Sequence, residues 1–358
     1  RHHDMSEIWR TYLEADNQTI YGNSNMTWPE FIVKSMVRRD RNCPSVILWS
    51  LGNELHSEVS VNECIQDARN LVNWVKEIDY NKATCRHTTL GNDSSTCLDD
   101  RGNNDPQDQA ALTIFDNDGI IAYNYGNEGQ LQTGLKQLPH LYGSESSSAV
   151  SSRGVYSYPG EGHIKYEETS NTYENPQHDG EYHLTSYDNS WVPWGQSAHK
   201  ALYRVLNYDG FAGHFIWTGF DYIGEPTPWN GNEGSKIQEG FAFPNSSYFG
   251  IVDTAGFEKD SYYLYRSHLV NTDTTLHLVG SLNKNNQYIA TDAPYTDMTR
   301  VDVYTNAAKT LIKQGNQLLA TINRYDTPTT KYVGGVDKPG DHTYFTYKVT
   351  VEPGQDGN

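Results

Sequence analysis

The spacing of apolar residues predicts alternating strands and helices between residues 27 and 223. The clearest strand is Ser45–Ser50, an apolar run typical of a strand that is buried on both faces. The clearest helix follows it, because apolar residues recur at helical spacing between Val61 and Ile78. Alternation of this kind indicates a parallel sheet with helical crossovers. The predicted strands are 45–50, 83–90, 120–126, 139–144 and 214–223, and the other predicted helices are 130–138, 196–206 and one that begins after Thr27.

Two of these helices carry sequence signals for their first turn. Thr27 and Glu30 form a capping-box pattern with Pro29 between them, and Ser60 and Glu63 repeat the pattern. In such a box, the hydroxyl and the carboxylate accept hydrogen bonds from backbone N–H groups that the helix leaves unpaired. We therefore expect side-chain caps at both positions.

Long polar loops follow the predicted strands, and the character of the chain changes near residue 267. The loops around 91–119, 146–186 and 224–250 are rich in Gly, Tyr, Asn and Trp, and loops at the carboxyl ends of parallel strands commonly build active sites. After Ser267 come short alternating stretches separated by Gly, Asn and Pro turns, which is typical of a small β-sandwich. We expect two domains, 1–267 and 268–358.

The excess of acidic over basic residues limits the kinds of molecule that this protein is expected to bind. Lys and Arg total 27 and Asp and Glu total 45, so the formal net charge is −18. This acidity argues against nucleic acid or an anionic membrane surface as partners, because both attract Lys and Arg patches. No run approaches the ~18 apolar residues of a membrane-spanning helix. The 26 tyrosines and 8 tryptophans supply flat amphipathic rings of the kind that suit sugars, although most fit ordinary structural positions.

The four cysteines, Cys43, Cys64, Cys85 and Cys97, match no zinc spacing. Cys85 and Cys97 bracket a polar loop and could form a disulfide, whereas Cys64 lies on the apolar stripe of a helix and fits a buried thiol. Four N-x-S/T sequons occur, about as many as an Asn-rich chain has by chance. A secreted or cell-envelope location is slightly favoured.

Two glutamates lie in the same local setting, each just beyond an apolar strand. Glu54 ends the stretch Trp49–Glu54, and Glu145 ends His140–Glu145, each after small residues that allow close approach. A carboxylate at the carboxyl end of a barrel strand points into the pocket at that face. A single glutamate there is more often a charge at the start of the next helix. Two of them match the acid/base and nucleophile pair of glycoside hydrolysis.

The stretches that flank these glutamates resemble glycoside hydrolase family 2. Residues 38–54 are similar to the acid/base signature of that family, and residues 142–156 are similar to its nucleophile segment. Residues 215–229 and 253–265 resemble the last barrel strand of its β-galactosidase members and the segment after that strand. The resemblance spans nearly the whole chain. It implies an α/β fold with a (β/α)8 TIM-barrel catalytic domain, of which this chain covers roughly strands 4–8, followed by an all-β immunoglobulin-like sandwich.

The resemblance also implies roles for individual residues. Glu54 is implied to be the acid/base, Glu145 the nucleophile, and Asn53 a hydrogen-bond partner of the sugar 2-hydroxyl. Trp217 and Asp221, at the end of the last strand, are implied to contact the galactosyl ring and its hydroxyls.

Two further residues, Tyr125 and His87, are candidates for the site but also fit purely structural roles. Tyr125 resembles the tyrosine that hydrogen-bonds the nucleophile in the family, but it also fits a ring in the barrel wall. His87 ends its predicted strand and could reach the pocket, but a structural histidine at the barrel mouth is the commoner case. Weaker candidates from the loops are Asp188, Trp191 and Trp229.

The sequence requires no cofactor and leaves a divalent or monovalent metal open. His2, His3 and Asp4 fit a polar loop better than a metal site, and Cys43 stands where the family usually has His or Asn. The expected partner is a carbohydrate substrate, with no nucleic acid and no membrane, and a homo-oligomer is left open. Family members carry a jelly-roll domain and an immunoglobulin-like domain before the barrel. We therefore expect this chain to be the C-terminal part of a longer polypeptide.

The leading hypothesis is a retaining exo-β-galactosidase that uses two carboxylates in a double displacement. One alternative is another specificity of the family, β-glucuronidase or β-mannosidase. A glucuronidase needs cations for the sugar carboxylate, and the last strand offers Asp221 and Glu225 instead. The other alternative is a catalytically silent glycan-binding or structural protein, against which the presence of both glutamates argues.

Overall fold

The computed structural model describes a set of separate stretches of the chain, and every structural statement below concerns these residues. They are 27–53, 61–79, 87–93, 121–125, 141–156, 166–167, 172–173, 184–188, 190–192, 194–226, 245–280, 298–323 and 345–350. The chain divides into two compact units. Unit 1 lies within residues 1–145 and 208–215, and unit 2 lies within residues 146–207 and 216–358.

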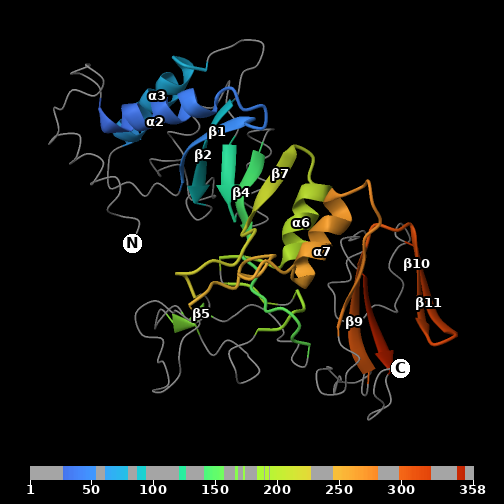
Figure 1. The fold of residues 1–358 in the computed structure, drawn as a ribbon. Helices are drawn as coiled ribbons and strands as arrows, with labels where there is room; N and C mark the ends of the chain where they lie inside the picture. Colours follow the sequence, from blue (N-terminus) through green and yellow to red (C-terminus); the bar gives the residue numbers. More distant parts are fainter. Residues whose placement is uncertain are drawn as a thin grey trace. The chain divides into compact units, whose positions relative to one another are not determined.

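A five-stranded sheet organises unit 1 (Figure 1). Its strands lie in the order of the chain, and the three neighbouring pairs from β1 to β4 are parallel. A doubly wound sheet reverses its strand order at a switch point, whereas a barrel adds each strand beside the last. The observed order is therefore that of part of a barrel. The strands are β1 (Leu48–Asn53), β2 (His87–Asp93), β3 (Ile121–Asn124), β4 (Leu141–Ser147) and β7 (Phe211–Trp217), the last two of which continue into unit 2.

The two helices of unit 1 are α2 (Trp28–Asp40) and α3 (Val61–Lys76), and they pack against each other. Their apolar stripes and β1 form one buried cluster that includes Val37, Trp49 and Val75. An ion pair also joins the helices, because Lys34 of α2 lies 2.5 Å from both Glu30 and Glu77, the latter just after α3. The predicted helix at 61–78 is confirmed.

The predicted cap at Thr27 is wrong. Helix α2 begins where the sequence predicts, but Thr27 makes no side-chain cap, and its buried hydroxyl has no hydrogen-bond partner among the described residues. Glu30 binds Lys34 one turn later instead of reaching back to Thr27. An i, i+4 ion pair therefore takes the carboxylate that a capping box would use.

The bounds of the strands differ from prediction, and for β1 and β7 the reason is that turns or loops take the backbone groups. Strand β1 begins at Leu48 rather than Ser45, since the Val46 N–H donates to the Cys43 carbonyl in a turn and Ile47 is 77% exposed. Strand β7 ends at Trp217 rather than residue 223. Beyond it, Phe220 forms an isolated bridge with Val252 instead of extending the ladder.

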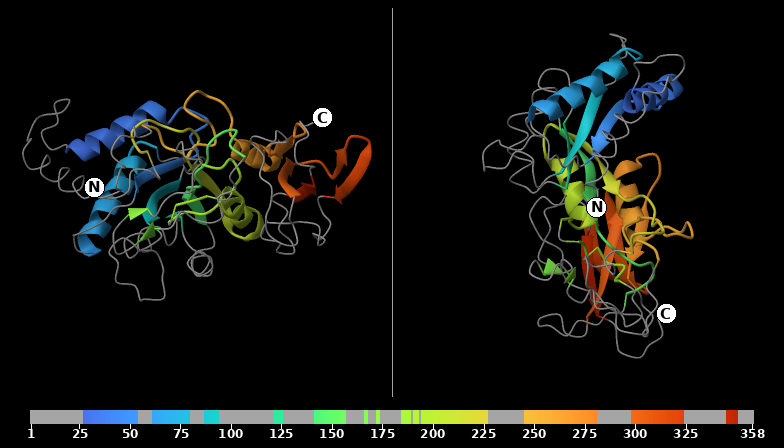
Figure 2. Two further views of the ribbon diagram at one scale, coloured as in Figure 1. Left: turned by 90° about the horizontal axis from the view of Figure 1, so that it is seen from below. Right: turned by 90° about the vertical axis from the view of Figure 1, so that its left-hand side faces the viewer.

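Unit 2 has a core built around two helices, α6 (Ala198–Asn207) and α7 (Asp260–Leu269). The helices contact each other, and α7 also contacts β8 and β9. Both views of Figure 2 place the orange helix α7 next to the orange-red strands that follow it in the chain. The shared cluster of fully buried side chains includes Leu202 from α6, Leu264 from α7 and Tyr304 from β9. The apolar pattern of 196–206 correctly predicted α6.

The last part of the chain contains short strands, as the sequence predicts, and the described pairs are antiparallel. One sheet has the order β12-β9-β8, and a hairpin joins β10 to β11 through Gly315, whose φ is +56°. The division at 268 and the immunoglobulin-like character stay predictions. The strands are β8 (Leu276–Val279), β9 (Met298–Thr305), β10 (Lys309–Gln314), β11 (Gln317–Asn323) and β12 (Phe345–Thr350), while β5 (Tyr166–Glu167) and β6 (Thr172–Tyr173) form a separate short ladder.

Some predictions fall outside the described residues: the helix at 130–138, the cap at Ser60, Cys85, Cys97 and the side chain of Cys64. Cys43 is exposed in the turn before β1, where its thiol lies 3.1 Å from the Ser45 hydroxyl. None of the helices that the structure describes is long and apolar enough to cross a membrane.

Gly250 lies where the segment after β7 meets the segment at 245–252, and this approach leaves no room for a side chain. A Cβ there would collide with the backbone nitrogen of Asp221 and the backbone carbon of Phe220. We expect Gly250→Ala to cost about 3 kcal/mol or more, because the obstacle is backbone rather than a flexible side chain. Thermal unfolding should show a fall in Tm of roughly 5 °C or more.

Gly219→Ala is the matched control, since a Cβ at Gly219 meets nothing within 4 Å. Equal Tm values for the two variants would contradict the close approach at Gly250.

Candidate active site

Glu145 lies near the end of β4, and the residue that contacts it comes from the end of β3. Parallel pairing sets Asn124 beside Glu145, and Tyr125 follows at once. The Tyr125 hydroxyl donates a hydrogen bond to Glu145 Oε2 at 2.9 Å, and the Tyr125 N–H donates to the Glu145 carbonyl at 2.8 Å. The two residues are 20 positions apart in the chain, so the register of the sheet brings them together.

The backbone of Tyr125 has a conformation that supports this contact. Its φ is +65°, in the left-handed region that non-glycine residues seldom adopt. Such a conformation costs on the order of 1–2 kcal/mol, and it persists where surrounding contacts enforce it. Here, the two hydrogen bonds to Glu145 supply that enforcement. Strain of this kind is concentrated at functional sites.

Strand β4, which carries Glu145, lies directly beside β7 in the sheet. A Cβ at Gly143 would lie 3.0 Å from the Cβ of His214, so the small residue that the sequence singled out does permit a close approach. Burial lowers the pKa of His214 to about 4, and the imidazole is therefore neutral at pH 7. The Ser144 hydroxyl donates to the side-chain oxygen of the buried Asn124 at 2.5 Å, which also joins β4 to β3.

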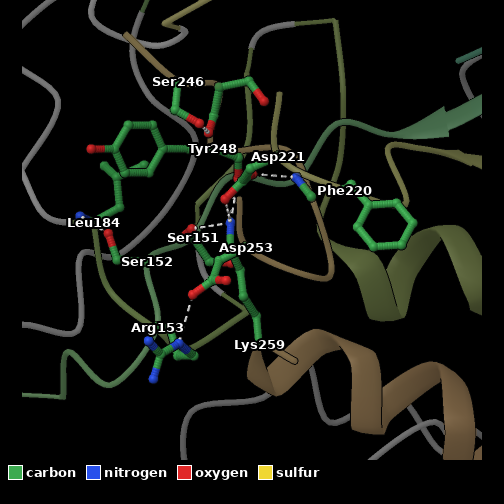
Figure 3. A network of polar contacts seen from close by, with 12 residues as sticks. Ser151, Ser152, Arg153, Leu184, Phe220, Asp221, Ser246, Tyr248, Asp253 and Lys259 are labelled. Atoms are coloured by element: carbon green, nitrogen blue, oxygen red, sulfur yellow. Dashed lines mark hydrogen bonds and ion pairs between the residues drawn. The ribbon is translucent and has the colours of Figure 1, made fainter. Parts of the chain in front are cut away.

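Trp217 and Asp221 belong to unit 2. The Trp217 ring meets the Tyr222 ring edge to face, with centroids 6.1 Å apart. The Asp221 carboxylate forms an ion pair with Lys259, 2.7 Å from Oδ2 to Nζ, and its Oδ1 accepts the Gly250 N–H at 2.7 Å (Figure 3). The direct contact of Asp221 with a sugar stays a prediction.

Burial is the largest influence on both members of this ion pair. It raises the pKa of Asp221 and lowers the pKa of Lys259, and the charge of each partner opposes the effect on the other. The Lys259 side chain is 2% exposed and the Asp221 side chain 8% exposed, so water screens this pair little.

Asp188, a weaker candidate from the loops, caps helix α6. Its carboxylate accepts the N–H groups of Ala198 and His199 and lies 2.8 Å from His199 Nδ1. The Ser197 hydroxyl contacts that same nitrogen, so the three side chains do not form the relay of a catalytic triad. Asp188 and Trp217 both line a small cavity of about 20 Å³, which has room for about one water molecule.

Of three other predicted residues, the structure describes only the backbone of Asn53 and His87 and does not describe Glu54. Asn53 is the last residue of β1 and pairs with Gly91, but its side chain lies outside the described residues, and so does the whole of Glu54. His87 begins β2, opposite Leu48, instead of ending it. The placement predicted for His87 is therefore wrong, because the strand starts later in the chain than the apolar pattern indicates.

No group of three or more His, Cys, Asp and Glu side chains gathers in the part of the chain that the structure describes. Trp229 and the residues His2, His3 and Asp4 lie outside that part, and Trp191 forms a short bridge with Ala149.

Comparison with known proteins relates this geometry to a family. The sequence model of "Glycosyl hydrolases family 2, TIM barrel domain" matches residues 8–123. Beta-galactosidase BoGH2A of Bacteroides ovatus is 30% identical over 349 residues, covering 86% of this chain. The chain belongs to glycoside hydrolase family 2. A putative beta-glucuronidase of Formosa agariphila is 29% identical over 249 residues, covering 67% of this chain.

The chain spans only part of each relative, 36% of BoGH2A and 21% of the Formosa protein. Among solved structures, a beta-glycosidase from Bacteroides vulgatus aligns with a TM-score of 0.60 at 23% identity, covering 93% of this chain and 37% of that one. Bacteroides uniformis beta-glucuronidase 2 aligns with a TM-score of 0.53 at 16% identity, covering 94% and 34%. These likenesses concern the fold, and together with the family match they confirm the TIM-barrel prediction.

Two residues of this family 2 chain, Lys259 and His214, make buried contacts near the predicted site residues, and the sequence did not indicate them. Lys259 lies within the stretch that carried the resemblance, but a lysine beside two acidic residues has the pattern of a solvated surface. His214 was counted only as part of an apolar strand. The sequence signal for His214 could have been Gly143 on the neighbouring strand, because a glycine there permits the close approach of the two strands.

Tyr125→Phe tests the contact between Tyr125 and Glu145 in the family 2 site. Phenylalanine keeps the ring but removes a hydrogen bond to a charged acceptor, which is typically worth about 1.5–3 kcal/mol. We expect kcat to fall roughly 10- to 100-fold, with little change in Tm. Steady-state kinetics on an aryl glycoside substrate measures the effect, and Tyr203→Phe, on helix α6, provides the matched control. An unchanged kcat would assign Tyr125 to the barrel wall.

Proposed function

We propose that this chain carries the catalytic carboxylates of a retaining exo-β-galactosidase, which removes terminal non-reducing β-D-galactose from glycosides. The observation that carries the proposal is the position of Glu145. It lies at the carboxyl end of a parallel strand, where barrel enzymes build their sites, and its carboxylate accepts the Tyr125 hydroxyl.

In the proposed mechanism, Glu145 attacks the anomeric carbon while protonated Glu54 donates its proton to the leaving oxygen. The galactosyl-enzyme then reacts with a water molecule that Glu54 deprotonates. A hydrogen bond from Tyr125 would hold the attacking oxygen of Glu145 in one orientation. Asn53 would bind the sugar 2-hydroxyl, and Trp217 would contact the galactosyl ring.

The choice of galactose over glucuronic acid has support in the charges near Trp217. A glucuronidase must hold the sugar carboxylate with cations. Of the basic side chains described in the segments around Trp217, Lys259 is paired with Asp221, and Arg153 is paired with Asp253 at 2.8 Å. The similarity to a beta-galactosidase over 86% of the chain favours the same specificity.

Hydrolysis of three chromogenic substrates by the intact protein tests the proposal: an aryl β-galactoside, the β-glucuronide and the β-mannoside. We expect kcat/KM to be highest for the galactoside by at least about 10²-fold. A preference for the glucuronide or the mannoside would overturn the proposed galactose specificity but would still be consistent with glycoside hydrolysis by this family. No hydrolysis of any of them would favour a silent glycan-binding protein.

The stereochemistry of the product tests the double displacement. Retention requires carboxyl groups about 5–5.5 Å apart, whereas inversion needs ~6.5–9.5 Å to admit a water molecule. We expect the first-formed galactose to have the β-configuration, as proton NMR spectra recorded early in the reaction would show. An initial α-product would mean an inverting pair and would remove Glu145 from the role of nucleophile.

A further inference from the structure

Lys259 occupies a junction of three chain segments in unit 2. It is the residue immediately before α7, and its backbone N–H donates to the Ile251 carbonyl at 2.8 Å. Its ammonium group lies 2.7 Å from Asp221 Oδ2, 2.7 Å from the Ser151 carbonyl and 3.3 Å from the Tyr248 carbonyl (Figure 3). Ser151 is 108 positions away in the sequence, so tertiary structure alone brings these groups together.

The hydrogen-bonding capacity of this group is fully used. An ammonium has three N–H donors, and here each has an acceptor, one of them a carboxylate. Each oxygen of Asp221 also has a partner, since Oδ2 binds Lys259 and Oδ1 accepts the Gly250 N–H. Removing either charge would leave the other buried without its partner, which is among the more disruptive changes a protein interior can suffer.

The segment held by this ion pair directly follows β7, whose last residue is Trp217. Its backbone interleaves with the segment at 249–252: Thr218 N–H donates to Phe249, Ile251 N–H to Thr218, and Asp221 N–H to Val252. The Trp217 ring packs against the buried cluster that contains Phe249. The position of that ring therefore depends on how these two segments are fixed.

We infer that Asp221 and Lys259 act together as a positioning pair that holds Trp217 for the sugar, and that Asp221 does not itself bind a sugar hydroxyl. The ion pair with Lys259, the hydrogen bond from Gly250 and the 8% exposure of the side chain, which leaves little of it accessible to a ligand, support the second statement. This role rests on the proposed glycosidase function. A misplacement of about 1 Å at a binding group can cost on the order of 10²-fold in rate.

The test compares Asp221→Asn, Lys259→Met and the double variant in the intact protein, with Lys200→Met, an exposed lysine of α6, as the control. The substrates are the aryl β-galactoside and analogues that each lack one hydroxyl. Titration with a 2-deoxy-2-fluoro galactoside counts the competent sites, so that kcat/KM is expressed per folded site. The double variant leaves no unpaired buried charge, and it keeps the test open if Lys259→Met fails to fold.

We expect each variant except the control to lose about 10²-fold in kcat/KM, by the same factor on every analogue. The double variant should lose no more than either single variant, because both remove the same pair. A loss for Asp221→Asn that disappears on one analogue would identify a direct hydrogen bond to that hydroxyl and overturn the inference. Unchanged kcat/KM per site with a lower Tm would overturn it too. A wild-type protein inactive on all glycosides would instead refute the proposed function, and this role with it.

Discussion

Glu145→Ala should abolish turnover of β-galactosides while leaving the fold intact. The reaction loses the nucleophile that forms the covalent intermediate, and a loss of at least about 10⁴-fold in kcat is typical when such a group is removed. Because Glu145 is only partly buried and contacts Tyr125 at the end of the sheet, its truncation leaves the apolar core unchanged. The measurement is kcat on an activated aryl galactoside, with Tm as the check on folding.

Azide adds a test that a merely damaged enzyme would fail. A small anion can occupy the space left by the carboxylate and attack the same face of the sugar, so activity should return with an α-configured galactosyl azide as the product. Glu258→Ala, at an exposed glutamate, is the control and should behave as wild type. A β-configured azide, or a Glu145→Ala variant that remains active, would show that another residue is the nucleophile.

Glu54→Gln should produce the second largest effect, and its size should depend on the leaving group. Galactosides with poor leaving groups need a proton on the departing oxygen, and general acid catalysis typically contributes about 10²–10⁴-fold. Activated aryl galactosides leave without that help, so the formation of their galactosyl-enzyme should slow little. Presteady-state kinetics on a series of aryl galactosides gives this dependence as a slope against the leaving-group pKa.

The expected slope is steeper for the variant than for the wild type. Equal losses across the series would exclude Glu54 as the acid and would point to a role in binding or folding.

The candidate site could be predicted from sequence only where the signal is local. Glu145 stands out because an apolar strand and small residues precede it, and these features are contiguous in the chain. His87 was misplaced because the same apolar pattern sets where a strand can lie but not where its ladder begins. The boundary depends on which backbone groups find partners, and here pairing with β1 begins at His87 itself.

Partners distant in sequence were harder to predict, and the ion pair of Asp221 shows why. Near Trp217, the sequence offers acidic residues that suggest sugar contacts, and nothing local distinguishes a ligand from a buried ion pair. The cation comes from Lys259, beyond the next long loop. Thr27 shows a different limit, because the capping pattern and the competing i, i+4 pair of Glu30 with Lys34 lie in the same stretch of sequence, and only the structure shows which one forms.

The sequence by itself determined the alternation of strands and helices, the strand-rich character of the last part of the chain and the position of Glu145 near the carboxyl end of a strand. These features follow from the periodicity of apolar side chains, which reports the burial of each segment without reference to any other. Only the tertiary structure decided that the Tyr125 hydroxyl reaches Glu145 and that Lys259 joins Asp221 to Ser151. The physical reason is that such contacts depend on the register and packing of segments far apart in the chain, and one residue of shift would separate the partners.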